Sequence, residues 1–159
     1  METTELISQL LELPRQWEVY QVNFSEKSES KNKQVHIYIR YTDDKGVCMQ
    51  TGEICPVYDY RAERMWRDLD ILGYNSYLYC RVPRVKNSLG NIVSVPVPWA
   101  DEDNRTTKRF DDYAIKLLKA TKNQTSTGEL LGISYEKVNR IISISVERGI
   151  LLPKIVREI

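Results

Sequence analysis

The side chains best suited to chemistry in this chain lie in a stretch that reads as two helices joined by a tight turn. This stretch, residues 124–148, has its turn at Leu131-Gly132-Ile133-Ser134. The second helix would carry hydrogen-bonding side chains at its start and on its outer face, namely Ser134, Tyr135, Lys137, Asn139 and Arg140. Side chains of these types read base edges or hold phosphates. The pattern therefore predicts recognition of duplex DNA, and the alternative is an ordinary solvated helix in a helical domain.

The residues around the turn fit a helix-turn-helix. Gly132 tolerates a positive φ and would end the first helix, and Ser134 would cap the second. Gly128 leaves room for the second helix to cross close by. The expected inward positions are Leu130 and Leu131 in the first helix, and Val138, Ile141 and Ile142 in the second.

Catalytic or redox chemistry finds few candidates. The three cysteines, Cys48, Cys55 and Cys80, are too few and odd in number for a disulfide scaffold. The single histidine, His36, is expected at a surface position on a strand, and no Ser/His/Asp or Cys/His set is evident. The acidic pairs Asp68 with Asp70 and Asp111 with Asp112 are expected as surface or first-turn helix charges. We therefore predict no catalytic residues and no cofactor.

Charge is distributed unevenly along the 159 residues, although the formal net charge is only +1. Residues 1–58 carry 6 Lys/Arg against 9 Asp/Glu, whereas residues 104–148 carry 9 against 5. The positive charge thus coincides with the helix-turn-helix pattern, where binding to DNA would need it. The chain shows no signal peptide and no membrane-length apolar run, so a reducing cytoplasm is the simplest location.

The rest of the chain predicts a β-rich part followed by helices. A helix at residues 4–13 would bury Leu6, Ile7, Leu10, Leu11 and Leu13 on one face. Strands are expected at 16–24, 35–41, 76–85 and 91–97, with a solvated loop at 25–33. After a linker at 101–105, a helix from Thr106 or Thr107 to about Thr121 would bury Phe110, Tyr113, Ala114, Leu117 and Leu118. The tail 150–159 is apolar.

Basic residues also occur on the strand expected at 76–85. Arg81, Arg84 and Lys86 are expected on one face, where they would contact phosphates beside the groove that receives the second helix. The alternative is that they are edge-strand charges that discourage aggregation.

Three segments in this order resemble a known family. They are CMQTGEICPVYDYRAERMWRDLD, YCRVPRVKNSLGNIVSVPVPWA, and TKRFDDYAIKLL…LLGISYEKVNRI…VERGI. Together they resemble the N-terminal half of bacterial insertion-sequence transposases of the ISL-three group, over about Trp17 to Ile150. The resemblance implies a small zinc-binding β-rich module, then a helix-turn-helix, then a catalytic domain with an Asp-Asp-Glu triad.

The sequence departs from the family where zinc would bind. The resemblance makes Cys48 and Cys55 the first ligand pair, but Asn87 and Gly90 stand where the second pair is expected. Asp68 also replaces the histidine of the family's WRHLD string. Structural zinc needs four nitrogen or sulfur ligands. We therefore expect no bound metal, with Cys48 and Cys55 as vestigial ligands.

These observations predict an α+β chain. Residues 1–100 would form a β-rich, degenerate zinc-finger-like (zinc-ribbon-like) module with an N-terminal helix. Residues 101–159 would form a three-helix helix-turn-helix domain with a truncated tail, and the chain would lack the catalytic domain. The expected function is recognition of the terminal inverted repeats of a mobile element, without catalysis, through the five residues of the second helix and through Arg84 and Lys86. The alternatives are an interaction module that binds or inhibits intact transposase, partly through the tail, and a stand-alone transcription regulator.

Overall fold

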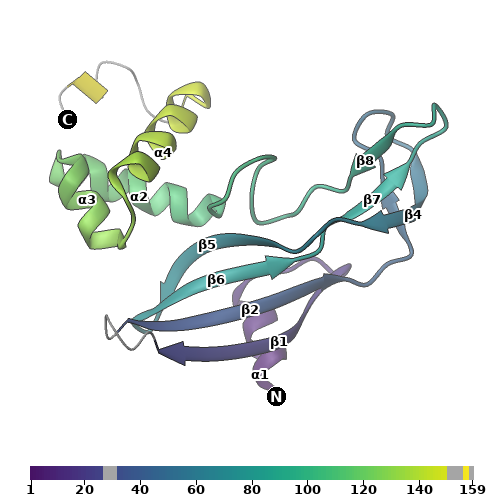
Figure 1. The fold of residues 1–159 in the computed structure, drawn as a ribbon, viewed down its shortest axis with the longest axis horizontal. Coiled ribbons are helices and arrows are strands. Elements are labelled where there is room, and N and C mark those ends of the chain that lie inside the picture. The colour runs from purple at the N-terminus through teal and green to yellow at the C-terminus, as the bar shows by residue number, and fades with distance from the viewer. Residues whose placement is uncertain (27–31, 150–155, 158–159) are drawn as a thin grey trace. The chain divides into compact units, whose positions relative to one another are not determined.

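The chain folds into two compact units. The computed structural model describes residues 1–26, 32–149 and 156–157. Unit 1 comprises Met1–Thr107, and unit 2 begins at Lys108. Among these described residues, unit 1 holds all the β-strands and one helix, and unit 2 holds three helices (Figure 1). The fold is therefore α+β, with β-sheets followed by a helical domain, as the sequence predicts.

The first sheet of unit 1 contains four strands in the order β1-β2-β6-β5. These are β1 (Trp17–Glu26), β2 (Lys33–Tyr41), β6 (Tyr74–Cys80) and β5 (Arg64–Ile71). β1 pairs antiparallel with β2, β2 runs parallel to β6, and β5 pairs antiparallel with β6. The strands on either side of the 25–33 stretch reach Glu26 and start at Lys33, so the expected loop is shorter than predicted; residues 27–31 lie outside the described residues.

The second sheet has the order β3-β4-β7-β8 and is antiparallel throughout. Its strands are β3 (Lys45–Val47), β4 (Ile54–Tyr60), β7 (Pro83–Lys86) and β8 (Ile92–Ser94). The single strand expected at 76–85 is therefore wrong: its two ends belong to different sheets, in β6 and β7. Pro83 explains the break, because a proline has no N–H to continue the ladder of the first sheet and instead begins the next strand.

Apolar side chains from both sheets and from α1 (Thr3–Leu10) form the core of unit 1. Its centre is a set of indole rings: Trp99 lies edge-on to Trp17 and to Trp66, with ring centroids 5.2 and 5.4 Å apart. Trp66 and Trp99 are 1% and 5% exposed, so both belong to this core. On the N-terminal helix, Ile7 is buried but Leu6 and Leu10 are exposed, so only part of the expected apolar face is used.

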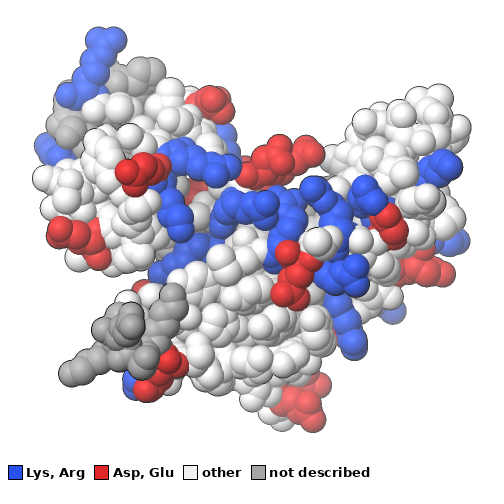
Figure 2. Space-filling view, viewed as in Figure 1, with Lys and Arg blue, Asp and Glu red and all other residues white. Residues whose placement is uncertain are grey.

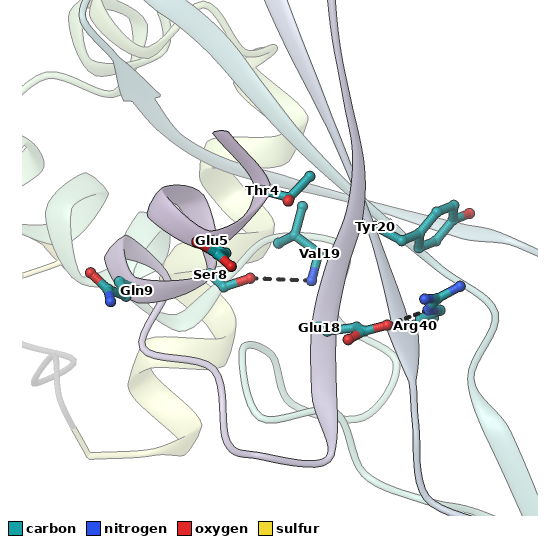
Figure 3. Close-up of a pocket in the computed structure, with 8 residues that line it drawn as sticks. All are labelled: Thr4, Glu5, Ser8, Gln9, Glu18, Val19, Tyr20 and Arg40. Atoms are coloured by element: carbon teal, nitrogen blue, oxygen red, sulfur yellow. Dashed lines mark hydrogen bonds and ion pairs between the residues drawn. The ribbon is translucent and has the colours of Figure 1, made fainter. Parts of the chain in front are cut away.

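Helix α1 covers the free edge of β1. The Ser8 hydroxyl accepts a hydrogen bond from the Val19 backbone N–H at 3.3 Å, which satisfies a donor that an edge strand would otherwise leave open. A groove of about 640 Å³ lies beside this contact. Figure 3 shows α1 on one side of β1, with Tyr20 and Arg40 on the other. Glu18 in the same groove is paired with Arg40 at 2.5 Å.

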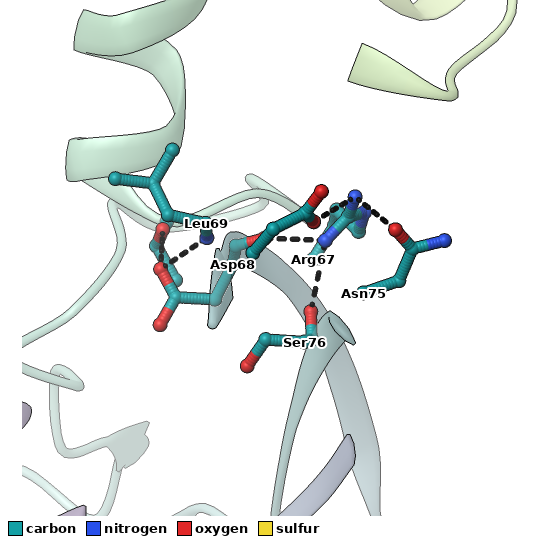
Figure 4. Close-up of polar contacts among 7 residues, drawn as sticks. Arg67, Asp68, Leu69, Asn75 and Ser76 are labelled. Atoms are coloured by element: carbon teal, nitrogen blue, oxygen red, sulfur yellow. Dashed lines mark hydrogen bonds and ion pairs between the residues drawn. The ribbon is translucent and has the colours of Figure 1, made fainter. Parts of the chain in front are cut away.

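A buried polar network ties the end of unit 1 to β5 (Figure 4). The Arg67 guanidinium donates to the backbone carbonyls of Asp68 and Ser76 and to the Asp70 carboxylate, the last at 2.7 Å. The Asp68 carboxylate, 2% exposed, accepts from the Leu69 N–H at 2.8 Å and from the Thr107 hydroxyl at 2.7 Å.

Backbone bonds complete this attachment. The Arg67 N–H donates to the Arg105 carbonyl, and the Thr107 N–H donates to the Arg67 carbonyl, so residues 105–107 run parallel to β5. The second half of the expected linker is therefore held on the sheet of unit 1, and Asp68 is a buried acceptor rather than a surface charge.

Unit 2 consists of α2 (Lys108–Thr121), α3 (Gln124–Leu131) and α4 (Tyr135–Glu147). Buried side chains from all three helices form its core: Phe110, Ala114, Ile115, Leu118, Leu131, Val138, Ile141 and Ile142. The expectation that Tyr113 and Leu130 face inward is wrong, because they are 46% and 64% exposed. Ile115, one turn after Asp111, is buried in place of Tyr113.

Candidate nucleic-acid interface

The turn between α3 and α4 has the geometry that its sequence predicts. Gly132 ends α3 with φ = 67°, in the left-handed region that favours glycine. Ser134 then caps α4, and its hydroxyl accepts from the Lys137 backbone N–H at 3.3 Å. At the other end of α3, the Asn123 side chain accepts from the Ser126 N–H at 2.9 Å. The N-termini of α3 and α4 are therefore both capped by side chains, and Gly132 ends α3.

Gly128 sets how closely α3 approaches the turn. A Cβ at this position would lie 2.9 Å from the Ile133 carbonyl oxygen and 3.5 Å from a methyl group of Val138. The first distance is shorter than real Cβ contacts allow, so any other residue would push the turn away from α3. The prediction that this small residue makes room for the second helix is confirmed.

All five side chains that the sequence assigns to DNA contact are exposed at the start of α4: Ser134, Tyr135, Lys137, Asn139 and Arg140. With about 100° between successive residues, Asn139 and Arg140 point away from the buried stripe, and Tyr135 and Lys137 flank it on opposite sides. The structure therefore gathers these groups on two turns of one helix. Whether they touch DNA stays a prediction.

Two further residues share this outward face, and sequence reasoning missed them. Glu136 and Ser143 are exposed and lie at helical spacing from Arg140 and Asn139. The Ser143 hydroxyl donates to the Asn139 backbone carbonyl at 3.1 Å, so the Asn139 side-chain amide is not used in that bond. The signal was available in the 3.6-residue period counted outward from Val138.

The basic residues of unit 1 do not form the single face that the sequence predicts. Arg81 lies between β6 and β7, and only Arg84 and Lys86 belong to β7. The Arg84 guanidinium donates to both oxygens of Asp59 on the neighbouring strand β4, at 2.6 Å for the Nε bond. This hydrogen bond raises the pKa of Arg84 and lowers the pKa of Asp59. Lys86 is exposed, with its ammonium 5.8 Å from the centre of the Tyr58 ring.

Cys48 lies in a loop that directs several hydrogen-bond donors at its thiol. The loop follows β3, and Gly52 closes it with φ = 75° and an N–H bond to the Cys48 carbonyl at 2.7 Å. The Thr51 hydroxyl, followed by backbone N–H groups of Thr51 and Gln50, lowers the pKa of Cys48. Burial instead raises the pKa of Cys55 on β4, whose thiol lies 3.9 Å from the Glu53 carbonyl.

Asn87 occupies the corresponding position in a second loop, between β7 and β8. Its side-chain oxygen accepts from the N–H groups of Leu89 and Asn91, both at 3.0 Å, and Gly90 closes the loop with φ = 84°. The Asn87 amide donates to the Cys48 sulfur at 3.6 Å and to the Gln50 side chain at 3.3 Å. One buried amide thus joins the two loops.

The residues around Cys48 do not fit a structural zinc ion. Tetrahedral zinc needs four nitrogen or sulfur ligands, and an amide that donates to the thiol cannot serve as one. Within residues 1–26, 32–149 and 156–157, no group of three or more His, Cys, Asp or Glu side chains could hold a metal ion.

The helices and the surface they present define a helix-turn-helix protein. Residues 95–143 match the helix-turn-helix domain of transposase family ISL3. The match starts at Val95, in the segment after β8, and ends within α4. Such a domain is a DNA-binding module and is not catalytic by itself. No curated protein and no solved structure matches the chain. Among the described residues, no helix has the length and apolar character to cross a membrane.

Proposed function

We propose that this chain binds duplex DNA sequence-specifically as part of an insertion-sequence transposase, and that it recognises the element's terminal inverted repeats through α4. The observation that carries the proposal is the set of five exposed hydrogen-bonding side chains at the start of α4, within a segment matching a transposase helix-turn-helix. In this class of fold the second helix enters the major groove with its N-terminal residues on the base edges.

Asn139 and Arg140 are the proposed base-reading pair. Asparagine bonds adenine through N6 and N7, and arginine bonds guanine through O6 and N7. Both side chains are exposed and lie off the buried stripe that contains Val138, so a groove can receive them without disturbing the core. Ser134, Tyr135 and Lys137 surround the first turn, where backbone phosphates approach a recognition helix.

Charge supports the same proposal. Unit 2 carries the excess of Lys and Arg, and that excess favours a polyanionic ligand. Arg84 and Lys86 on β7 are proposed as secondary phosphate contacts. Arg84 is the weaker of the two, because Asp59 already balances its charge.

We further propose that the chain performs no strand cleavage and that its β-rich part is a degenerate zinc module. The amide of Asn87 connects the Cys48 loop to the 87–91 loop. In the transposase family that the sequence resembles, the second pair of zinc ligands would lie in this 87–91 loop. A hydrogen bond therefore joins two loops that a metal ion would otherwise join.

A duplex-binding measurement tests the DNA proposal. The chain is titrated against a labelled duplex carrying the element's terminal repeat and against a scrambled duplex, over a series of salt concentrations. We expect tighter binding to the repeat, and a loss of about 1–3 kcal/mol with relaxed preference at one base position for Arg140→Ala. The double variant Asn139→Ala, Arg140→Ala should bind both duplexes alike.

Ser143→Ala provides a matched control, because it alters the same outward face further from the N-terminus of α4. It should leave the preference for the repeat unchanged. Equal affinity of the wild type and the Asn139→Ala, Arg140→Ala variant would show that α4 reads no bases. An interaction module that binds intact transposase would then be the better proposal; the apolar tail invoked for it, residues 150–159, lies largely outside the described residues.

A further inference from the structure

Strands β2 and β6 carry the same series of side chains side by side. The two strands are adjacent and parallel, and their register pairs His36 with Tyr77 and Tyr38 with Tyr79. Two residues further along each strand comes an arginine, Arg40 in β2 and Arg81 just after β6. Each strand therefore reads aromatic, aromatic, arginine on one face, a regularity that packing of the sheet alone does not require.

The rings on this face stack across the strands. The Tyr38 and Tyr79 rings lie nearly parallel, 16° apart, with centroids 4.7 Å from each other. The His36 and Tyr77 rings are 15° apart with centroids 5.7 Å from each other. The Tyr79 hydroxyl and the His36 Nδ1 atom lie 2.7 Å apart, and this hydrogen bond connects the Tyr38–Tyr79 pair to the His36–Tyr77 pair. The result is a rigid aromatic surface, named here the tyrosine face after Tyr38, Tyr77 and Tyr79.

This surface is the side of the sheet turned away from the core. Val35, Ile37 and Leu78, which alternate with these rings, are 0–2% exposed and belong to the core. The three tyrosines are only half-buried. Helix α1 contributes its buried Ile7 to the core and not to the tyrosine face.

Cations lie at one end of the tyrosine face. The Arg40 side chain is 61% exposed and its guanidinium lies 5.4 Å from the centre of the Tyr20 ring, while it also pairs with Glu18. Arg81 is exposed, and its Nε donates to the Arg61 carbonyl at 3.1 Å. On the face drawn in Figure 2, Lys and Arg side chains of unit 1 gather beside uncharged surface. Burial, together with the negative charge of nearby Glu63, raises the pKa of Tyr79 and of Tyr20, so both phenols remain uncharged.

We propose that the tyrosine face binds single-stranded DNA, with unpaired bases lying across the edges of the Tyr38 and Tyr79 rings and phosphates on Arg40 and Arg81. The two rings cover one face of each other, so a base meets them edge-to-face. Every base has a π-face, so such contacts beside cations bind single strands with little sequence preference. Arginine side chains hold phosphates with several donors at once. The choice of DNA as the polymer rests on the proposed function of α4; the ring and charge chemistry does not.

The test measures binding of a labelled single-stranded thymidine oligonucleotide to the full chain at low salt, by fluorescence anisotropy. Replacing both rings in Tyr38→Leu, Tyr79→Leu should lower affinity by about tenfold or more, because leucine keeps an apolar side chain but has no aromatic edge to meet a base. The variant Tyr38→Phe, Tyr79→Phe keeps the rings and should stay within about threefold of the wild type.

Tyr58→Leu is the matched control. Tyr58 is a 55% exposed tyrosine with a lysine over its ring, but it lies on β4 in the other sheet. It should leave the thymidine affinity unchanged. If tryptophan fluorescence shows that the leucine double variant is unfolded, the exposed pair Arg40→Ala, Arg81→Ala decides instead. It must lower the affinity, and any flattening of the salt dependence should come mainly from Arg81, because Arg40 is already paired with Glu18.

The α4 variant Asn139→Ala, Arg140→Ala separates this proposal from the previous one. It should lose the preference for the repeat duplex and still bind the thymidine strand. The Tyr38/Tyr79 leucine variant should keep the preference for the repeat duplex and bind the thymidine strand weakly. No binding of the thymidine strand by the wild type would overturn the proposal and leave the face to a protein partner. Equal losses from Tyr58→Leu and from the Tyr38/Tyr79 leucine variant would also overturn it.

Discussion

The two units differ in what their polar side chains bind. In unit 1, the side chains of Arg67, Asp68 and Asn87 are buried, and they bond to backbone groups and to other side chains such as Asp70, Thr107 and Cys48. In unit 2, the polar side chains at the start of α4 are exposed, and the Ser134 hydroxyl among them caps its own helix. Polar side chains therefore hold the fold together in unit 1 and face solvent at the start of α4 in unit 2.

This difference separates stability from binding. A buried polar side chain that satisfies several backbone groups stabilises the fold, because its loss leaves those groups without partners. An exposed one contributes little to stability and is available to a ligand. Changes to the polar residues of unit 1 should therefore alter unfolding, and changes to α4 should alter binding. All three tryptophans lie in unit 1, and within the described part of the chain three of the four helices lie in unit 2. Tryptophan fluorescence and helical circular dichroism therefore follow the two units separately.

The largest expected effect is on unit 1, from Asn87→Ala. The change removes the acceptor for two loop N–H groups and the donor to the Cys48 sulfur, and we expect a loss of about 2–3 kcal/mol in the free energy of unfolding. Denaturant titration followed by tryptophan fluorescence measures it. Asn87→Asp keeps the acceptor and should lose less.

A metal chelator sharpens the same test. Because a hydrogen bond rather than an ion joins the two loops, a chelator should leave the fluorescence transition of the wild type where it is. One zinc ion per chain, released together with the fold, would contradict both this expectation and the proposed degenerate module.

The next effect falls on unit 2 and arises from packing rather than polar bonds. Gly128→Val places methyl groups against the Ile133 carbonyl, and we expect a loss of about 1–3 kcal/mol. Helical circular dichroism should show it, with no change in the tryptophan transition. Glu129→Val introduces the same side chain at the exposed neighbouring position and should cost less; equal losses would mean that the close approach at Gly128 is not what matters.

The helix-turn-helix was predictable because its determinants are local. Gly132, Ser134 and the Val138 stripe act within one or two helical turns, and the structure places each as expected. Even there, periodicity did not decide which flank of the stripe packs inward. It misplaced Tyr113 and Leu130 because that choice depends on the position of the neighbouring helices.

The β-rich part was less predictable because its pairing is long-range. The break between β6 and β7 depends on a change of sheet, and the Arg84–Asp59 pair joins residues 25 positions apart. Likewise, the departure of Asn87 from the expected ligand pattern was visible in the sequence. Its bond to Cys48, 39 positions away, was not.

A smaller effect is expected at the edge of the α4 surface. Lys137 is exposed in the first turn, where it would hold a phosphate. Lys137→Ala should weaken binding to repeat and scrambled duplexes alike, by roughly 0.5–1.5 kcal/mol, and lower the slope of log affinity against log salt by about 1. Salt titration of both duplexes measures this. A loss confined to the repeat would instead make Lys137 a base contact.

The smallest effect is expected from Arg84, where the comparison between the units is tested most directly. Like Lys137 it is a cation proposed to meet phosphate, but its guanidinium already donates to both oxygens of Asp59. As long as Arg84 stays paired with Asp59, its binding to a phosphate releases few counterions. Arg84→Ala should therefore change the slope of log affinity against log salt by clearly less than Lys137→Ala does. Asp59→Asn should have the opposite sign, because it removes a carboxylate and frees the cation for DNA. If Arg84→Ala flattens the salt slope as much as Lys137→Ala, then the ion pair with Asp59 does not prevent Arg84 from binding a DNA phosphate. The division between a stabilising unit and a binding unit would then fail.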